Sequence, residues 1–174
     1  LKRTALIYDF DGTLARGNLQ EQSFIPNIGM SRDAFWAEVK RRTKDYNADE
    51  ILVYMHLMLE KAREVRRPVT IEALRKHGSE ALLFPGLVGC DWFNRINKHA
   101  ETEGLKLEHY IISSGIHEMI EGCSIRNAFT EVFASKFIYN DGVAAWPGVG
   151  INYTTKTQYL FRINKDVCNH WDNE

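Results

Sequence analysis

The stretch TALIYDFDGTLARG, residues 4–17, carries the strongest structural signal in this sequence. Residues 4–9 form a short apolar run without helical periodicity, which is typical of a strand buried on both faces, as in a parallel sheet. Two carboxylates, Asp9 and Asp11, then stand two residues apart, and Gly12 follows directly. Because glycine adopts backbone angles that other residues avoid, the pattern predicts a sharp turn immediately behind the two acids.

The two acids are predicted to share one site. Ligands of open parallel sheets bind beyond the carboxyl ends of the strands, and residues two apart in an extended segment point to the same side. Repulsion between two close carboxylates is relieved by a divalent cation or by a transferred proton. We therefore expect Asp9 and Asp11 to converge there, with the Gly12 N–H free to approach an anion.

A hairpin is the alternative interpretation of Asp11 and Gly12, because Asp-Gly between apolar runs is a common two-residue turn. The residues that follow, LARGNLQEQSFIPN at 14–27, contain no strand of alternating polarity that pairs with residues 4–9. The sequence thus offers no local partner for a hairpin at this point.

Residues 15–84 have a different texture and predict an all-helical insert. Three segments in it have helical spacing, and each begins with a residue type that commonly caps helices. The segments and their expected caps are 31–46 with Ser31, 47–67 with Asn47, and 70–83 with Thr70.

Strands and helices alternate on either side of this insert, an order that predicts βαβ units and an α/β fold with a Rossmann-like parallel sheet. We expect a core formed by residues 1–14 and 85–174, and a helical cap formed by residues 15–84. The expected core elements after the cap are a helix at 88–103, strands at 107–113 and 131–140, a helix at 116–121, a turn at 140–142, an extended flap at 143–153 and a helix from Thr154 or Thr155 to Asn164.

Two further groups stand where a phosphate site would need them. Ser113, Ser114 and Gly115 follow an apolar run, so they place hydroxyl and N–H groups at a strand end before a helix; simple capping of that helix is the alternative. Lys156 lies in the first turn of a helix, where a cation is disfavoured unless a nearby negative group attracts it; a solvated lysine is the alternative.

Taken together, the motifs DFDGTLA at 9–15, YIISSG at 110–115 and TTKTQ at 154–158 resemble the haloacid dehalogenase superfamily of phosphohydrolases. The position of the helical insert is similar to the branch with a C1-type cap, which includes phosphoserine phosphatase. The resemblance implies that Asp9 is a nucleophile that forms an aspartyl-phosphate. It also implies that Asp11 protonates the leaving group and then activates water, a role that favours phosphoryl transfer over cleavage of carbon–halogen bonds.

The same resemblance assigns the remaining groups of the site. Ser113 would hold the phosphoryl oxygens together with Gly12, Ser114 and Gly115, and Lys156 would balance their charge. A Mg²⁺ ion would bridge the phosphate and Asp9 and take the main-chain carbonyl of Asp11. The implied substrate is a small phosphorylated metabolite, and cap residues such as Arg16, Arg41, Tyr46 and Arg63 are candidates to select it.

The sequence departs from the family where a fourth motif, a strand ending in an acidic cluster such as GDxxxD, is expected. After Lys156 only Asp166, Asp172 and Glu174 are acidic, and none follows a strand-like run. We expect that the chain stops before the last core strands, which leaves residues 4–9 as an unpaired edge. Alternatives are completion by another subunit and a catalytically silent phosphate-binding or interaction module; a phosphotransferase or mutase is a further reading of the same chemistry.

Composition narrows the remaining function classes. The 174 residues include 22 basic and 23 acidic side chains, so the net charge of -1 gives no electrostatic footprint for nucleic acid or an anionic membrane. Cys90, Cys123 and Cys168 lack metal or disulfide spacing and predict reduced thiols in a cytoplasmic protein. Leu1 leads straight towards the first strand without a signal peptide. Because Leu1 is not methionine, we expect that the chain has lost something at its start. The oligomeric state is left open.

Overall fold

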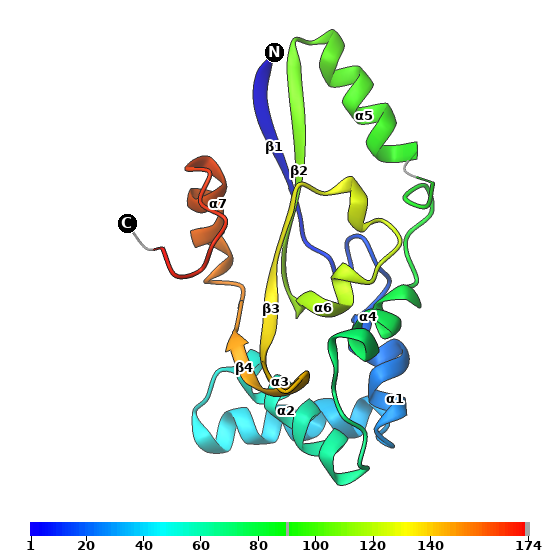
Figure 1. The fold of residues 1–174 in the computed structure, drawn as a ribbon, viewed down its shortest axis with the longest axis vertical. Coiled ribbons are helices and arrows are strands. Elements are labelled where there is room, and N and C mark those ends of the chain that lie inside the picture. Colours follow the sequence, from blue (N-terminus) through cyan, green and yellow to red (C-terminus); the bar gives the residue numbers. More distant parts are fainter. Residues whose placement is uncertain (90, 173–174) are drawn as a thin grey trace.

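The computed structural model describes residues 1–89 and 91–172, so Cys90 and Glu174 lie outside the described residues. Figure 1 shows an α/β core above a group of helices. The elements in chain order are β1 (Lys2–Tyr8), η1 (Gln20–Phe24), α1 (Ile25–Asn27), α2 (Arg32–Tyr46), α3 (Glu50–Glu64), α4 (Ile71–Ser79), α5 (Asp91–Thr102), β2 (Leu105–Ile116), α6 (His117–Glu121), η2 (Arg126–Ala128), β3 (Glu131–Asn140), β4 (Val143–Val149) and α7 (Lys156–Asn164).

The described strands form one sheet in the order β1-β2-β3-β4. β1, β2 and β3 are parallel, and β4 returns antiparallel to β3. The turn between β3 and β4 uses positive φ at Asp141 (49°) and Gly142 (79°), as a tight hairpin requires. The predicted α/β fold with a parallel core is therefore confirmed, and the extended flap expected at 143–153 is confirmed over Val143–Val149.

The prediction that the first strand is buried on both faces is wrong. Within the described residues β1 pairs only with β2, so β1 is an edge strand, as the sequence also predicted. Its side chains alternate between exposed and half-buried, and Ile7 is 38% exposed. The reason is that α7 covers the face of β1 that carries Ala5 and Ile7 only in part. A groove of about 310 Å³ remains there, lined by Ala5, Ile7 and Leu160 among others.

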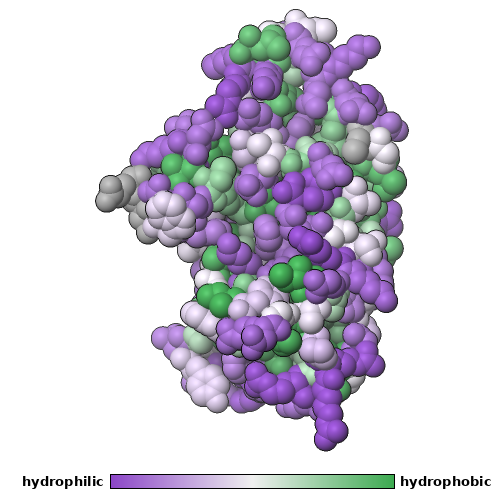
Figure 2. Space-filling view, in the orientation of Figure 1, coloured by the Kyte–Doolittle hydropathy of each residue, from purple (hydrophilic) through white to green (hydrophobic). Residues whose placement is uncertain are grey.

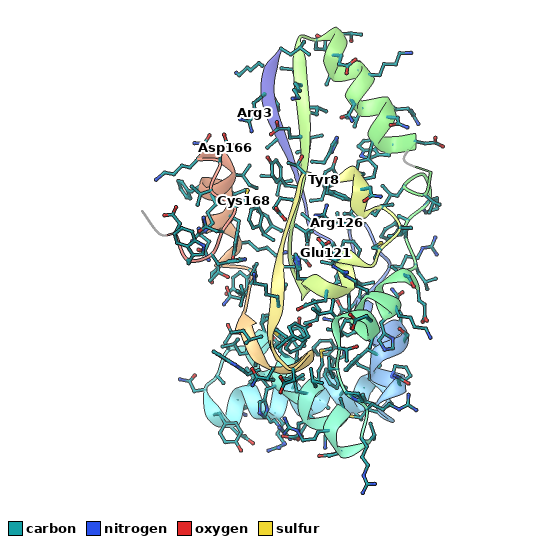
Figure 3. The ribbon with its side chains drawn as sticks, in the orientation of Figure 1. Arg3, Tyr8, Glu121, Arg126, Asp166 and Cys168 are labelled. Carbon is teal, nitrogen blue, oxygen red and sulfur yellow. The ribbon has the colours of Figure 1, made fainter. Side chains whose placement is uncertain are left out.

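Two apolar clusters lie on opposite faces of β2. Ile111 belongs to the large cluster, whereas its neighbours Tyr110 and Ile112 belong to a smaller one with Tyr159 and Ile163 of α7. Figure 1 accordingly shows α5 and α6 on one side of the strands and α7 on the other. Arg3 of β1 joins Glu108 of β2 and Asp166 beyond α7 through ion pairs of 2.9 Å, and Figure 3 shows Arg3 and Asp166 near each other.

The helical character of residues 15–84 is confirmed, whereas the domain boundaries at 14 and 85 stay a prediction. Ser31 and Thr70 cap α2 and α4 as expected, because their hydroxyls accept from Ala34 N–H and Ala73 N–H. The prediction that Asn47 caps the next helix is wrong. Asp49 caps α3, while Asn47 ends α2 in a left-handed conformation with φ 48°.

Of the helices in the described ranges, none combines the length and apolarity needed to cross a bilayer. Figure 2 shows that the visible face is mostly hydrophilic, with apolar residues in small separate patches.

Cys123, which is buried, and Cys168, which is exposed, are free thiols, as predicted for these two residues.

Candidate active site

Asp9 and Lys156 form an ion pair at the carboxyl end of the sheet. Asp9 follows β1 directly, Lys156 is the first residue of α7, and Lys156 Nζ lies 2.9 Å from Asp9 Oδ1. The Phe10 N–H donates to the same oxygen over 2.8 Å. The lysine side chain is only 24% exposed, which is at odds with a freely solvated lysine. The negative group that the helix position called for is therefore Asp9.

Asp11 is packed against the end of β2. Its Oδ1 accepts from the Leu19 N–H over 3.1 Å. A Cβ placed on Gly115 would lie 2.9 Å from Asp11 Oδ2 and 3.2 Å from Ser113 Oγ, which is too close for a side chain. A residue without a side chain at position 115 thus lets Asp11, Ser113 and Gly115 meet.

The two acids sit in different environments. Asp9 is 46% exposed, whereas burial raises the pKa of the Asp11 carboxyl from 3.8 to about 7. The Leu19 N–H and Lys156 act against this rise in the Asp11 pKa, and the charges of Asp9 and Glu21 add to it. A carboxyl group with a pKa near neutrality can both donate and accept a proton, which suits a general acid–base.

Ser113 and Ser114 do not cap the following helix. The strand predicted to end at Ser113 continues to Ile116 with a register shift, and α6 begins there without a side-chain cap. Ser113 is fully buried and its Oγ accepts from the Gly115 N–H over 3.0 Å. The Ser114 carbonyl accepts from the hydroxyl of Tyr54, in α3, over 2.7 Å. The capping interpretation is therefore wrong, and α3 is joined directly to this strand end.

Gly12 makes the predicted sharp turn with φ 75°, but its N–H is not free for an anion. That N–H donates to the Ala15 carbonyl over 2.8 Å. The N–H groups of Leu14 and Ala15 return to the Phe10 carbonyl, so the chain coils locally after the acids. The hairpin alternative is wrong as well, because β1 pairs in parallel with β2.

Comparison with known proteins identifies the family. The family model of haloacid dehalogenase-like hydrolases matches residues 6–159. The chain belongs to this family. A protein of Borreliella burgdorferi described as uncharacterized is 28% identical, over 92% of this chain and 64% of its own length.

Solved structures of the family share this fold. A HAD family hydrolase from Salmonella enterica serovar Typhi matches with a TM-score of 0.63 and 16% identity, over 94% of this chain and 51% of its own. A phospho-aspartyl intermediate analogue of phosphoserine phosphatase matches with a TM-score of 0.62 and 15% identity, over 95% of this chain and 73% of its own. The chain thus spans about half of the Salmonella hydrolase and less than two thirds of the Borreliella relative.

In this haloacid dehalogenase-like chain, a cavity of about 610 Å³ opens between the cap helices and the core. Asp11 and Ser114 lie on its core side, and Trp36 and Tyr54 line it from α2 and α3. Asp11 lines the cavity, whereas Asp9 is not among its lining residues. The full lining is Asp11, Asn18, Gln20, Glu21, Arg32, Asp33, Trp36, Lys40, Glu50, Ile51, Tyr54 and Ser114.

The cap residues suggested by the sequence are not those that line the cavity. Arg41 instead pairs with Glu38 and Asp45, and Arg16 lies over the Phe84 ring at 5.7 Å. Tyr46 and Arg63 are also absent from the cavity lining. No sequence motif marks Trp36 or Tyr54, because aromatic residues at helical spacing are equally typical of a core.

Asp9 offers one exposed carboxylate to a magnesium ion that would also bind substrate. Among residues 1–89 and 91–172, no cluster of three His, Cys, Asp or Glu side chains is suited to a metal. Mg²⁺ in phosphate-processing sites takes one or two carboxylates with substrate oxygens and waters. The half-exposed Asp9 carboxylate is one such ligand, and the resemblance implies the Asp11 main-chain carbonyl as the other.

Proposed function

We propose that this protein is a Mg²⁺-dependent phosphatase that hydrolyses a small phosphomonoester through an aspartyl-phosphate on Asp9. The observation that carries the proposal is the arrangement of two unlike carboxyls: Asp9 is half-exposed and paired with Lys156, whereas burial raises the pKa of Asp11 beside it to about 7. Family membership supports hydrolysis as the reaction class. The phospho-aspartyl state named for a structural neighbour supports Asp9 as the nucleophile.

The reaction has two steps. An Asp9 carboxylate oxygen attacks phosphorus, the ester P–O bond breaks, and the departing oxygen takes the proton of Asp11. Asp11, now ionised, takes a proton from water as that water attacks phosphorus. The bond between phosphorus and Asp9 then breaks, which releases phosphate and restores both acids.

The neighbouring groups hold the phosphoryl oxygens. Lys156 carries the positive charge nearest the nucleophile and balances charge on the transferring group. Ser113 Oγ accepts from Gly115 N–H, so its own hydroxyl proton is available to a phosphoryl oxygen. Mg²⁺, held by the Asp9 carboxylate and the Asp11 carbonyl, would withdraw charge from those oxygens when bound.

The position of Asp11 supports the cavity as the leaving-group site. Asp11 borders the cavity and Asp9 does not, so an ester oxygen that receives the Asp11 proton faces the space between α2 and α3. A cavity of about 610 Å³ has room for a small metabolite. We propose the cytoplasm as the location, consistent with free thiols at Cys123 and Cys168.

One observation favours a second candidate, a catalytically silent phosphate-binding module. In the part of the chain that the structure describes, no third acidic, histidine or cysteine side chain joins Asp9 and Asp11 in a metal cluster. Phosphate would then bind beside Ser113 and Lys156 without being released from an ester.

Phosphate release from an aryl phosphate, measured with and without Mg²⁺ on the longest native form of the protein, separates the two candidates. The phosphatase predicts release that needs the metal and falls to background in Asp9→Asn. Asp45→Asn, an exposed acid of α2, is the matched control and keeps full activity. Release that survives Asp9→Asn contradicts the proposal, and phosphate binding without any release supports the silent module.

A further inference from the structure

Ser135 of β3 is a fully buried hydroxyl with two hydrogen bonds. Its Oγ donates to the Ser114 carbonyl over 3.2 Å and accepts from the Ile151 N–H over 2.9 Å. A buried hydroxyl destabilises a core unless it is hydrogen-bonded. Both the donor and an acceptor position of Ser135 are used, and they reach two different parts of the candidate site.

The first partner belongs to the phosphate-binding end of β2. Ser114 lies between Ser113 and Gly115, and its carbonyl also accepts from Tyr54 in the cap. Two donors, one from β3 and one from α3, therefore hold this peptide group in place. A shift of the Ser114 carbonyl would move Ser113 Oγ and the main chain that packs against Asp11.

The second partner begins the segment that carries Lys156. Ile151 is fully buried, and the next residue, Asn152, receives the Lys156 N–H on its carbonyl over 3.1 Å. The Asn152 side-chain oxygen accepts from the N–H groups of Thr154 and Thr155. The segment from Ile151 to Lys156 is thus internally bonded, so fixing Ile151 fixes the start of α7.

We propose that Ser135 is a positioning residue, whose hydroxyl sets the spacing between the phosphate-binding end of β2 and the lysine at the start of α7. This inference rests on the proposed phosphatase function. Ser135 does not contact the reacting groups, and it acts through Ser114 on one side and through Ile151 on the other. Displacements of reacting groups by about 1 Å can lower rates about a hundredfold, so loss of this bridge reduces turnover.

Kinetics of Ser135→Ala with an aryl phosphate test the inference. We expect kcat to fall about tenfold or more, with a smaller change in KM, and Ser135→Thr to recover part of kcat because it keeps the hydroxyl. Val132→Ala is the matched control, because Val132 lies in the same strand but belongs to the large apolar cluster. It lowers the melting temperature while kcat of the folded protein stays within about twofold of wild type.

The outcomes separate this inference from the proposed function. If wild type shows no Asp9-dependent release, the proposed function fails and Ser135 has no reaction to support. If wild type is active and folded Ser135→Ala has the wild-type kcat, the positioning role is overturned alone. Should Ser135→Ala fail to fold, Ser135→Cys keeps the side-chain size with a weaker acceptor, and unchanged kcat in that variant overturns the role equally.

Discussion

Asp9 and Asp11 are two residues apart, yet their surroundings assign them different chemistry. Asp9 is half exposed, and its carboxylate forms an ion pair with Lys156 over 2.9 Å. Asp11 lies against Gly115 and the cavity wall, and burial raises its pKa to about 7. The sequence predicts that both acids share a site, because the strand period places them on one side. It does not predict which of the two is buried, since that depends on residues from β2 and the cap.

The raised pKa of Asp11 predicts a pH-dependent stability in the metal-free protein. The folded state holds the proton more tightly than the unfolded state, so this contribution to stability is full below about pH 4 and is lost as pH rises to about 7. Asp11→Asn cannot ionise. We expect the variant to exceed wild type at pH 8 by about 2 kcal/mol in free energy of unfolding, because one pKa unit is worth about 1.4 kcal/mol and solvent screens part of the shift.

Thermal melts in EDTA across pH 4 to about 8 measure this difference. The advantage of Asp11→Asn should shrink to nothing at the acid end, while Asp45→Asn, which loses only an exposed ion pair with Arg41, should stay within about 0.5 kcal/mol of wild type at every pH. A constant offset between Asp11→Asn and wild type at every pH would show that Asp11 does not titrate in this range.

Other individual residues show where sequence reasoning stops. Lys156 stands in the first turn of a helix, where the helix dipole disfavours a cation, so this local rule predicts the nearby anion with which Lys156 pairs. The Gly12 N–H, by contrast, donates to the Ala15 carbonyl in a local coil, and no sequence motif predicts this hydrogen bond. Tyr54 and Ser135 meet at Ser114 from distant segments, and only the tertiary fold brings them together.

The helices and strands were more predictable than the contacts between them. β3 spans Glu131–Asn140, the range expected from its apolar run, and Ser31 and Thr70 begin their helices as caps. The start of α3 was misplaced because Asn47 and Asp49 are both good caps, and Asn47 instead suits the left-handed end of α2. The short turns η1 and α1 were missed because they are too brief to have a clear period.

Packing of the cap helix α4 on the core helix α6 depends on two glycines. A Cβ on Gly78 would overlap the Met119 main chain, and one on Gly122 would overlap the main chain of Arg75. The two helices therefore approach backbone to backbone. Because main-chain atoms have no alternative rotamer, neither helix can accommodate a side chain at these points without separating.

Gly78→Ala should for this reason lower the free energy of unfolding by about 3 kcal/mol, the upper end of the usual range for overpacking. The intrinsic preference of alanine for helices acts in the opposite direction by about 1 kcal/mol, so a purely local effect would stabilise the protein. Chemical denaturation measures the sign. Lys76→Ala, exposed in the same helix, is the control and should change stability by less than about 0.5 kcal/mol.

The candidate site lies where the cap and the core are fastened to each other. Asn152 donates to Asp49 over 2.8 Å, the Ala144 N–H donates to the Val69 carbonyl over 2.8 Å, and Tyr54 reaches Ser114. The bond from Tyr54 to Ser114 joins two residues that line the cavity, so cap and core position its wall jointly there. The sequence predicted the helical insert at 15–84, but these pairings join segments up to about a hundred residues apart, which no local pattern reveals.

The proposed aspartyl-phosphate on Asp9 is best sought in Asp11→Asn supplied with an aryl phosphate. A good leaving group departs without an acid, whereas the second step needs Asp11 to activate water, so the covalent species should accumulate. Acid quenching and peptide mass analysis should then find the phosphoryl group on Asp9, with a stoichiometric burst of aryl alcohol and neither signal in the Asp9→Asn, Asp11→Asn double variant. Wild-type turnover of the same ester without any phosphorylated Asp9 in Asp11→Asn would contradict the mechanism.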